Sequence, residues 1–379
     1  MRIAVVTETY PPEVNGVALT VHTLVSQMAA SGHQMTLVRP RQPGVSALPP
    51  PQPIEELLVA GAALPKYPGL RFGFPAGRLL ARHFGTRRPD AVYVATEGPL
   101  GWSAVRAARK LGIPVATGFH TRFDSYAGAY GLGPLTPLVR AWLRLMHNAA
   151  GATIVPTAEL RDWLEQQGFH GVRVVARGVD TALFDPARRD AGLRGRWGVA
   201  PGGLAVIYVG RIAPEKNLEL AIEAFHAIRR QRADARFVWV GAGPLADRLR
   251  REHPDFVFTG LRLGEDLAAH FASADLFLFP SLTETFGNVT LEAMAAGVPT
   301  VAFDYGAARA HMRDRGHGRV VACDDAKGFV NAAVELALDE AARGEMGRAA
   351  RRAALALSPE KVARDFVGLL ASLPAGAPA

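Results

Sequence analysis

The sequence predicts an α/β protein built from two doubly wound parallel sheets. Two observations carry this prediction: strand-like apolar segments alternate with helix-like amphipathic segments almost from end to end, and the alternation restarts near the middle of the chain. The length of 379 residues agrees with two domains, because a domain averages about 150 residues. With 49% hydrophobic and 21% charged residues, the composition excludes a disordered chain and a membrane bundle.

The first half opens with a strand, a helix and a second strand. An apolar segment covers Ile3–Thr7, apolar positions recur at helical spacing over Val17–Met28, and a second strand is expected at Met35–Arg39. This order predicts a βαβ unit. Further strands of this half, each flanked by helix-like sequence, are expected at Ala91–Ala95, Pro114–Gly118 and Thr153–Pro156.

The second half repeats the pattern, with helices such as Leu218–Arg230 between its strands. The expected strands are Ala205–Val209, Phe237–Val240, Phe256–Thr259, Leu276–Phe279 and Thr300–Phe303. Asp185-Pro186 and Pro201-Gly202-Gly203 interrupt the chain between the halves. We therefore expect one domain over residues 1–180, a second over 181–355, and a C-terminal segment 356–379. The five prolines of Pro43–Pro53 predict a stiff loop or connector, and the tail from Pro374 is expected to be disordered.

Several classes of protein are excluded at this stage. No apolar stretch reaches the roughly 18 residues that span a bilayer, and the N-terminus lacks a signal-peptide pattern. Cys323 is the single cysteine, so neither an intrachain disulfide nor a cysteine-based zinc site can form. We expect a cytoplasmic protein whose stability comes from packing.

The net charge of +8 is concentrated in the first half. Residues 1–190 carry +7 and residues 191–379 carry +1, and the segment 66–144 alone carries +9. This asymmetry favours an anionic partner for the first half, such as a phospholipid surface, a nucleic acid or an acidic substrate. A surplus of arginine on solvated faces is the alternative.

The stretch from Phe279 to Pro299 is typical of a ligand-binding strand–turn–helix. A strand ends near Phe279, Gly287 permits close backbone approach, and a helix is expected from Asn288 to Gly297. The free N–H groups of a helix start can bind a phosphate or sugar hydroxyls. Glu284 precedes this helix and Glu292 lies inside it, so two carboxylates would accept hydroxyl hydrogen bonds at different points along one ligand.

A second motif follows the strand Ala205–Val209. Gly210 and Arg211 leave the strand, and Lys216 lies at the start of the next helix, so two cations and a helix dipole would converge on one anion. This pattern predicts a diphosphate site. A third loop, with Gly241 and Gly243, resembles a dinucleotide fingerprint only weakly, because the third glycine is absent.

Two features of the first half complete the candidates. Asn15-Gly16 replaces the glycine-rich fingerprint of a nicotinamide enzyme at the first strand–helix junction, which argues against an oxidoreductase and favours a backbone contact with phosphate. His120 follows the strand Pro114–Gly118 on the side where parallel sheets bind ligands.

Taken jointly and in order, these motifs resemble one family. Glu284 and Glu292, spaced Glu-x7-Glu, are similar to the signature of retaining nucleotide-sugar glycosyltransferases of the GT-B fold, which include phosphatidylinositol mannosyltransferases and sucrose synthases. Three further segments resemble motifs of the same family. Gly210–Asn217 is similar to its diphosphate motif, Asn15-Gly16 to its N-terminal loop, and Gly178–Asp180 to its interdomain segment. The resemblance covers most of the chain. It implies two Rossmann-like domains facing across a cleft, with the C-terminal helix returning to the first domain.

The resemblance also implies residue roles. Glu292 would bind the donor ribose, Glu284 the hydroxyls of the transferred sugar, and Arg211 and Lys216 the diphosphate. His120 would lie beside the sugar, near its C6 hydroxyl and the reacting centre, which makes His120, Arg211, Lys216 and Glu284 the implied catalytic set. Leu261 and Arg262 would lie near the base. The remaining residues implied to bind the donor, beside Glu292, are Asn15, Gly16, Gly210, Gly243, Phe286, Gly287, Asn288 and Val289. Arg177 departs from the family's frequent Asn-Gly-Val-Asp pattern, so no ligand contact is assigned to it.

A narrower resemblance concerns the donor. The segments Phe119–Tyr126, Tyr130–Leu132 and Ala176–Arg189 look like bacterial GDP-mannose-dependent α-mannosyltransferases. The implied reaction moves a hexose, mannose from GDP-mannose, to an acceptor hydroxyl with retention, by same-face attack assisted by the donor phosphate. A UDP-glucose or other UDP-sugar donor and a sugar-nucleotide epimerase are the alternatives. No Asp-x-Asp motif is present, so neither a metal nor another cofactor is expected.

The basic first half then has an implied use, because the N-terminal domain of GT-B enzymes receives the acceptor. Apolar and basic residues interleave there, namely Phe72, Phe74, Leu79, Leu80 and Phe84 with Arg71, Arg78, Arg82, Arg87 and Arg88. This mixture suits an anionic membrane surface carrying a lipid or glycan acceptor, so we expect peripheral attachment at the inner face of the cytoplasmic membrane. A nucleic-acid partner is not expected, because it would leave the two glutamates and the two cations unexplained.

Overall fold

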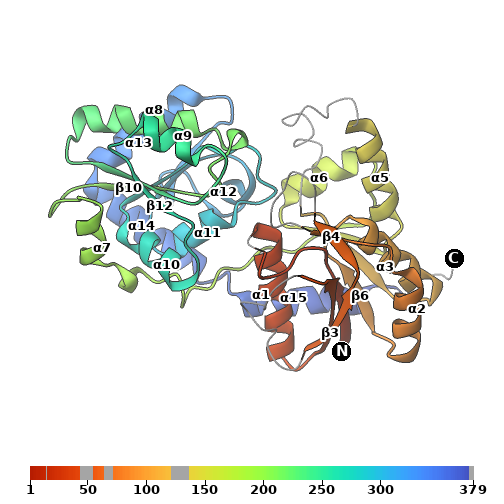
Figure 1. The fold of residues 1–379 in the computed structure, drawn as a ribbon. Coiled ribbons are helices and arrows are strands. Elements are labelled where there is room, and N and C mark those ends of the chain that lie inside the picture. The colour runs from red at the N-terminus through yellow and green to blue at the C-terminus, as the bar shows by residue number, and fades with distance from the viewer. Residues whose placement is uncertain (14, 43–53, 64–70, 121–135, 375–379) are drawn as a thin grey trace. The chain divides into compact units, whose positions relative to one another are not determined.

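The computed structural model describes residues 1–13, 15–42, 54–63, 71–120 and 136–374 (Figure 1). The chain divides into two compact units: unit 1 contains Met1–Arg177 and Pro359–Ala379, and unit 2 contains Gly178–Ser358. Three segments discussed above, Pro43–Pro53, residues 121–135 and residues 375–379 of the tail, lie outside the described residues.

Unit 1 is built on a parallel sheet with seven described strands in the order β3-β2-β1-β6-β7-β8-β9. Their bounds are β1 Arg2–Val6, β2 Gln34–Pro40, β3 Ile54–Val59, β6 Ala91–Val94, β7 Val115–Gly118, β8 Ala152–Val155 and β9 Val172–Val174. β4 (Gly61–Ala63) and β5 (Arg71–Gly73) form a separate two-stranded antiparallel sheet.

Helices cover both faces of this sheet. Successive strand residues point to opposite faces, so each strand contributes apolar side chains to both layers of helices. Ile3 and Val5 of β1 pack with α1 (Gly16–Ala30) and α15 (Pro359–Ser372). Ala4 and Val6 pack on the other face, with the helices α2 (Gly77–Thr86), α3 (Pro99–Lys110) and α5 (Thr136–Asn148). α6 (Ala158–Gln166) packs in a smaller cluster with Phe119.

Unit 2 repeats the plan with six described parallel strands in the order β12-β11-β10-β13-β14-β15. Their bounds are β10 Ala205–Val209, β11 Arg236–Val240, β12 Val257–Gly260, β13 Leu276–Phe279, β14 Thr300–Phe303 and β15 Gly318–Val321. One face packs against α8 (Leu218–Gln231), α9 (Ala246–Glu252) and α13 (Ala326–Leu338). The other packs against α7 (Ala191–Arg196), α10 (Gly264–Ser273), α11 (Asn288–Ala295), α12 (Gly306–His311) and α14 (Glu340–Ala354).

The predicted fold class, α/β with two doubly wound parallel sheets, is confirmed. Every strand predicted from the sequence is present, with ends that differ by at most about one residue, within the usual uncertainty of element boundaries. In each sheet the strand order reverses once, between β1 and β6 in unit 1 and between β10 and β13 in unit 2. Such a reversal is where doubly wound sheets bind ligands, at the carboxyl ends of the strands. No described helix combines the length and the apolar character needed to cross a bilayer.

Gly243 keeps two loops of unit 2 in contact. A Cβ atom at this position would overlap the backbone of Ile212, including its carbonyl oxygen. We expect Gly243→Ala to lower the free energy of unfolding by about 1–3 kcal/mol, since the loop after β11 must move away from the loop after β10. Urea denaturation measures this change. Gly195→Ala in α7 is the control, because nothing lies within 4 Å of its added Cβ; equal losses in the two variants would contradict the packing role of Gly243.

Candidate functional site

Two loops meet at the carboxyl end of the sheet of unit 2, where the strand order reverses. One follows β10 and contains Gly210 and Lys216, and the other follows β13 and contains Glu284 and Gly287. The two strands are neighbours in the sheet, so their following loops start side by side. The structure thus brings together the two motifs that the sequence separates by about 70 residues.

An ion pair joins the two loops. The Lys216 Nζ atom lies 2.5 Å from Glu284 Oε1, and Lys216 is buried. Ser281 Oγ donates a second hydrogen bond, of 2.9 Å, to the same carboxylate oxygen. A charged hydrogen bond of this kind is stronger than a neutral one, so each loop fixes the position of the other.

Two neutral hydrogen bonds reinforce this ion pair. Asn217 Nδ2 donates to the Pro280 carbonyl oxygen at 3.2 Å, and Thr283 Oγ1 donates to the Glu215 carbonyl oxygen at 2.9 Å. Asn217 has the left-handed φ of 54°, which asparagine tolerates better than most residues. The junction between the two loops is therefore held by side chains of the protein itself.

Arg211 differs from Lys216 in its exposure. Its side chain is 45% exposed, and its Nη1 atom lies 3.4 Å from Glu215 Oε1. Its backbone is anchored, because the buried Tyr208 hydroxyl donates to the Arg211 carbonyl oxygen at 3.1 Å. Burial, together with Glu284 and Glu215, raises the pKa of Tyr208 well above its usual range, so this hydroxyl remains a donor.

The helix α11 begins at the same junction. Gly287 precedes it with a φ of +92°, and no side-chain hydrogen bond caps this N-terminus in the part of the chain that the structure describes. A helix N-terminus carries a partial positive charge and presents N–H donors. Phe286 is buried in the core and Val289 is half-buried against it, so these residues offer their backbone more than their side chains.

Glu292 of α11 is the least satisfied acidic group of this region. Its Oε2 atom is buried and has no hydrogen-bond partner among the described residues. Burial raises the pKa of Glu292 to about 7. A buried polar atom without a partner is rare in folded proteins, so Glu292 Oε2 is a candidate acceptor for a ligand group or a water molecule.

Leu261, Arg262 and Gly243 follow other strands of the same sheet. Leu261 is 54% exposed after β12, the edge strand. Arg262 donates from Nη2 to the Thr259 carbonyl oxygen at 2.7 Å and from Nη1 to Asp266 Oδ2 at 3.0 Å. Gly243 lies after β11, between the edge strand and β10. Among the described residues, no hydrogen bond or ion pair joins Leu261, Arg262 or Gly243 to Lys216 or Glu284.

Asn15, Gly16 and His120 belong to unit 1. The Asn15 Oδ1 atom caps α1 by accepting from the Val17 and Ala18 N–H groups at 3.1 and 2.9 Å, so this side chain is committed to the fold. The backbone of Gly16 is open, since an added Cβ would meet nothing within 4 Å. His120 is half-buried, with Tyr93 and Arg177 on its two ring nitrogens.

Sequence reasoning missed several partners of the predicted residues. Ser281 and Asn217 fix the Lys216–Glu284 junction, and Tyr93 and Arg177 fix His120. A serine three residues before Glu284 and an asparagine directly after Lys216 were visible signals of turn chemistry. Tyr93 gave no signal, because it looks like any aromatic residue of a buried strand.

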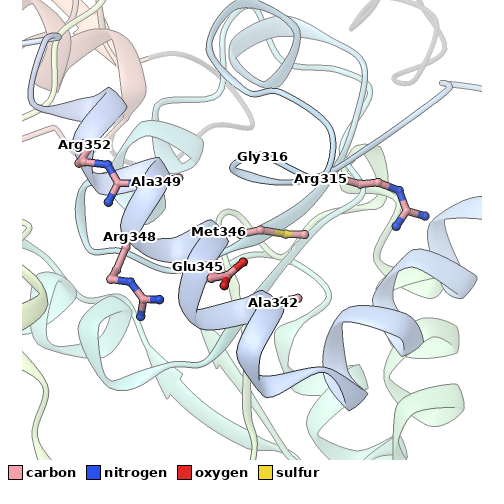
Figure 2. A pocket seen from close by; sticks show the side chains of 8 residues that line it. All are labelled: Arg315, Gly316, Ala342, Glu345, Met346, Arg348, Ala349 and Arg352. Atoms are coloured by element: carbon pink, nitrogen blue, oxygen red, sulfur yellow. The ribbon is translucent and has the colours of Figure 1, made fainter.

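A separate pocket of about 370 Å³ lies between Arg315-Gly316 and one side of α14 (Figure 2). Figure 2 shows Arg315 on one side of the pocket and Arg348, which belongs to α14, on the other. None of the residues predicted from the sequence lines this pocket. We therefore place the candidate site at the loop junction rather than here.

Comparison with known proteins gives the family. A model described as "Glycosyltransferase Family 4" matches residues 14–183, and one described as "Glycosyl transferases group 1" matches residues 203–339. A protein of Mycolicibacterium smegmatis named GDP-mannose-dependent alpha-mannosyltransferase is 34% identical over 373 residues, which cover 97% of this chain and 96% of the relative. The chain belongs to the group 1 glycosyltransferases.

Two further comparisons place this glycosyltransferase among its relatives. A Mycobacterium tuberculosis protein named GDP-mannose-dependent alpha-(1-6)-phosphatidylinositol dimannoside mannosyltransferase is 29% identical, with 79% of each chain covered. The solved structure of sucrose-phosphate synthase from Thermosynechococcus elongatus superposes with a TM-score of 0.77 at 19% identity, over 97% of this chain and 98% of that one. The fold is therefore that of the GT-B glycosyltransferases, as the resemblance implied.

Proposed function

We propose that this glycosyltransferase transfers mannose from GDP-mannose, with retention, to a hydroxyl group of a lipid or glycolipid acceptor. The observation that carries the proposal is the loop junction of unit 2, where the Lys216–Glu284 pair, the start of α11 and the orphaned Glu292 oxygen follow adjacent strands. The donor assignment is supported by the 34% identical relative, which is named for GDP-mannose. The acceptor assignment is supported by the relative named for a phosphatidylinositol dimannoside.

In this proposal the diphosphate binds to cations and to the helix start. Lys216 is the fixed cation, since Glu284 and the buried surroundings hold its ammonium group in place. Arg211 is the mobile cation, because its exposed guanidinium can turn from Glu215 to a phosphate oxygen. The backbone of Gly287 and Asn288 and the dipole of α11 add neutral donors at the same point.

The two glutamates bind hydroxyl groups. Glu284 has one oxygen engaged by Lys216 and Ser281, and we assign its remaining acceptor capacity to the transferred sugar. Glu292 Oε2 is assigned to the ribose, whose adjacent hydroxyls would provide the donor that none of the described residues supplies there. Leu261 and Arg262 are assigned to the base, and His120, Asn15 and Gly16 are proposed contacts from unit 1.

The chemistry then depends on positioning and on charge stabilisation. The sugar–phosphate bond breaks as the acceptor hydroxyl attacks the same face, and a donor phosphate oxygen receives the proton of that hydroxyl. Lys216 and the start of α11 stabilise the negative charge that develops on the departing diphosphate. The proposed reaction requires no metal ion and no other cofactor.

The proposal is tested by incubating the protein with radiolabelled GDP-mannose or UDP-glucose and a bacterial lipid extract. We expect label from GDP-mannose in the lipid fraction and at least about tenfold less from UDP-glucose. Preferential transfer from UDP-glucose would overturn the donor assignment. Conversion of the donor without any transfer would overturn the transferase itself.

For the acceptor we propose that unit 1 docks on an anionic membrane at the inner face of the cytoplasmic membrane. Of the apolar residues named from the sequence, Leu80 and Phe84 are fully buried in the core, whereas Phe74 and Leu79 are 44% and 42% exposed. Leu80 and Phe84 therefore cannot contact lipid, because they pack α2 against the sheet. The helix α5 offers a larger apolar stripe, with Leu138, Trp142 and Leu145 exposed at helical spacing and Arg140 and Arg144 beside them.

Flotation with liposomes tests this docking surface. We expect the protein to float with vesicles that contain anionic lipid, and the double variant Leu138→Gln, Leu145→Gln to bind at least about tenfold more weakly, since two apolar anchors are lost. Leu355→Gln in unit 2, which alters a leucine that is 52% exposed, is the matched control. Absence of binding to both anionic and neutral vesicles would end the docking proposal.

A further inference from the structure

His120 is held from both sides by residues of its own unit. Its Nδ1 atom lies 3.0 Å from Arg177 Nη2, and its Nε2 atom lies 2.6 Å from the Tyr93 hydroxyl. Arg177 also donates from Nη1 to the Thr20 hydroxyl on α1 at 2.6 Å. The guanidinium therefore connects the segment after β9, the helix α1 and the ring of His120.

Gly118 makes room for this arrangement. A Cβ atom at position 118 would overlap the Tyr93 hydroxyl and would lie 2.6 Å from His120 Nε2. Real Cβ contacts essentially never come so close, so any larger residue would separate the two side chains. The absence of a side chain two residues before His120 is thus a requirement of the His120–Tyr93 contact.

Only one protonation state of the His120 ring satisfies the donors and acceptors of these groups. A guanidinium has only N–H donors, so Nδ1 of His120 must accept and cannot carry a proton. The single ring proton then lies on Nε2 and is donated to the Tyr93 oxygen. A charged imidazolium would direct a second N–H at the guanidinium, which the geometry forbids.

We propose that Arg177 is a positioning residue that holds His120 as the neutral, Nε2-protonated tautomer, so that the His120 ring keeps one fixed orientation and transfers no proton. This inference rests on the proposed function, in which the donor phosphate takes the acceptor proton. The electrostatics agree, because burial, Arg177 and His147 all lower the pKa of His120 well below its usual range.

The tautomer can be read by ¹⁵N NMR of the full chain labelled in its histidines, with His120→Gln identifying the signals of His120. We expect the neutral Nε2–H pattern in the wild type, unchanged between about pH 5 and 8, where an unperturbed histidine titrates. Arg177→Met removes the donor to Nδ1, so both neutral tautomers should appear. Arg177→Lys and Tyr93→Phe should keep the wild-type pattern, because each leaves a donor on Nδ1.

Arg173→Gln is the matched control, since Arg173 is an exposed arginine of the same unit whose guanidinium donates to the Val172 carbonyl oxygen. Where transfer is measured, Arg177→Met should lower kcat about 10- to 100-fold with a smaller change in donor KM, as expected for lost positioning. An Nδ1–H or charged His120 in the wild type would overturn the inference, as would an unchanged signal in Arg177→Met. These spectra need no substrate, so a failure of the proposed reaction is seen separately, in the transfer assay.

Discussion

Lys216→Met is expected to lower kcat/KM for transfer about 10²- to 10³-fold. The substitution removes the cation proposed to stabilise the departing diphosphate, and it leaves the Glu284 carboxylate without its ion-pair partner at 2.5 Å. Removing one group that stabilises charge in the transition state costs about 2.7–4 kcal/mol, and each 1.4 kcal/mol corresponds to a factor of ten. The substitution should also destabilise the fold, since breaking a buried ion pair on one side costs about 3–5 kcal/mol. Most of the loss should fall on kcat, because charge on the leaving group is greatest in the transition state.

Steady-state kinetics with varied donor measure this effect, with Lys327→Met as the control at an exposed position of α13. Adding Glu284→Gln to Lys216→Met should recover part of the lost stability, because no unpaired charge then remains at the junction, but it should recover no activity. Activity of Lys216→Met within about threefold of the wild type would show that Lys216 does not act on the donor.

Glu292→Gln is expected to stabilise the free protein while weakening donor binding. The folded-state pKa of Glu292 is raised from 4.5 to about 7, so the folded protein holds a proton that the unfolded chain has released. The stability of the wild type therefore falls as the pH rises from about 4.5 to 7 and stays lowered above it. A glutamine cannot ionise, so above pH 7 the variant should be more stable by about 3 kcal/mol.

The affinity of the wild type for the donor should change with pH in the opposite direction to its stability. The carboxylate accepts hydrogen bonds from ribose hydroxyls more strongly than the neutral acid does, so wild-type affinity should rise as the pH rises toward about 7 and binding should release a proton. The variant should bind GDP about 10- to 100-fold more weakly, as expected for the loss of a charge-assisted hydrogen bond.

Thermal denaturation across this pH range and calorimetry in two buffers of different ionisation enthalpy measure both effects. Glu345→Gln is the control, an exposed glutamate in the pocket of Figure 2. A variant that is no more stable than the wild type above pH 7, or that binds GDP as tightly, would contradict the assignment of Glu292.

The sequence predicted the central strands of both sheets and missed particular edges. The strands β3, β9 and β15 were not predicted, and all three lie at the edge of a sheet with partly exposed residues. An edge strand is covered less completely than a central one, so its apolar pattern is weaker. The central strands are buried on both faces and are continuous apolar runs, as in β10 and β13.

The candidate site was predictable in its residue types but not in its pairings. Spacing alone placed Lys216 and Glu284 after two strands, and only the strand order makes those strands neighbours. Whether the Glu292 oxygen has a partner depends on how α11 packs, which the sequence does not show. The Asn15 side chain caps α1, so it is not available for a ligand at the same time. The contact of Arg177 with His120 joins residues 57 positions apart, which no local pattern reports.

The central claim is that the loop junction after β10 and β13 binds a nucleoside diphosphate, and a crystal structure with bound GDP tests it most directly. We predict the diphosphate at hydrogen-bond distance, about 3 Å, from Lys216 Nζ and the first N–H groups of α11, with a ribose hydroxyl on Glu292 Oε2. A diphosphate bound away from both Lys216 and α11, with Glu292 Oε2 still without a partner, would contradict it.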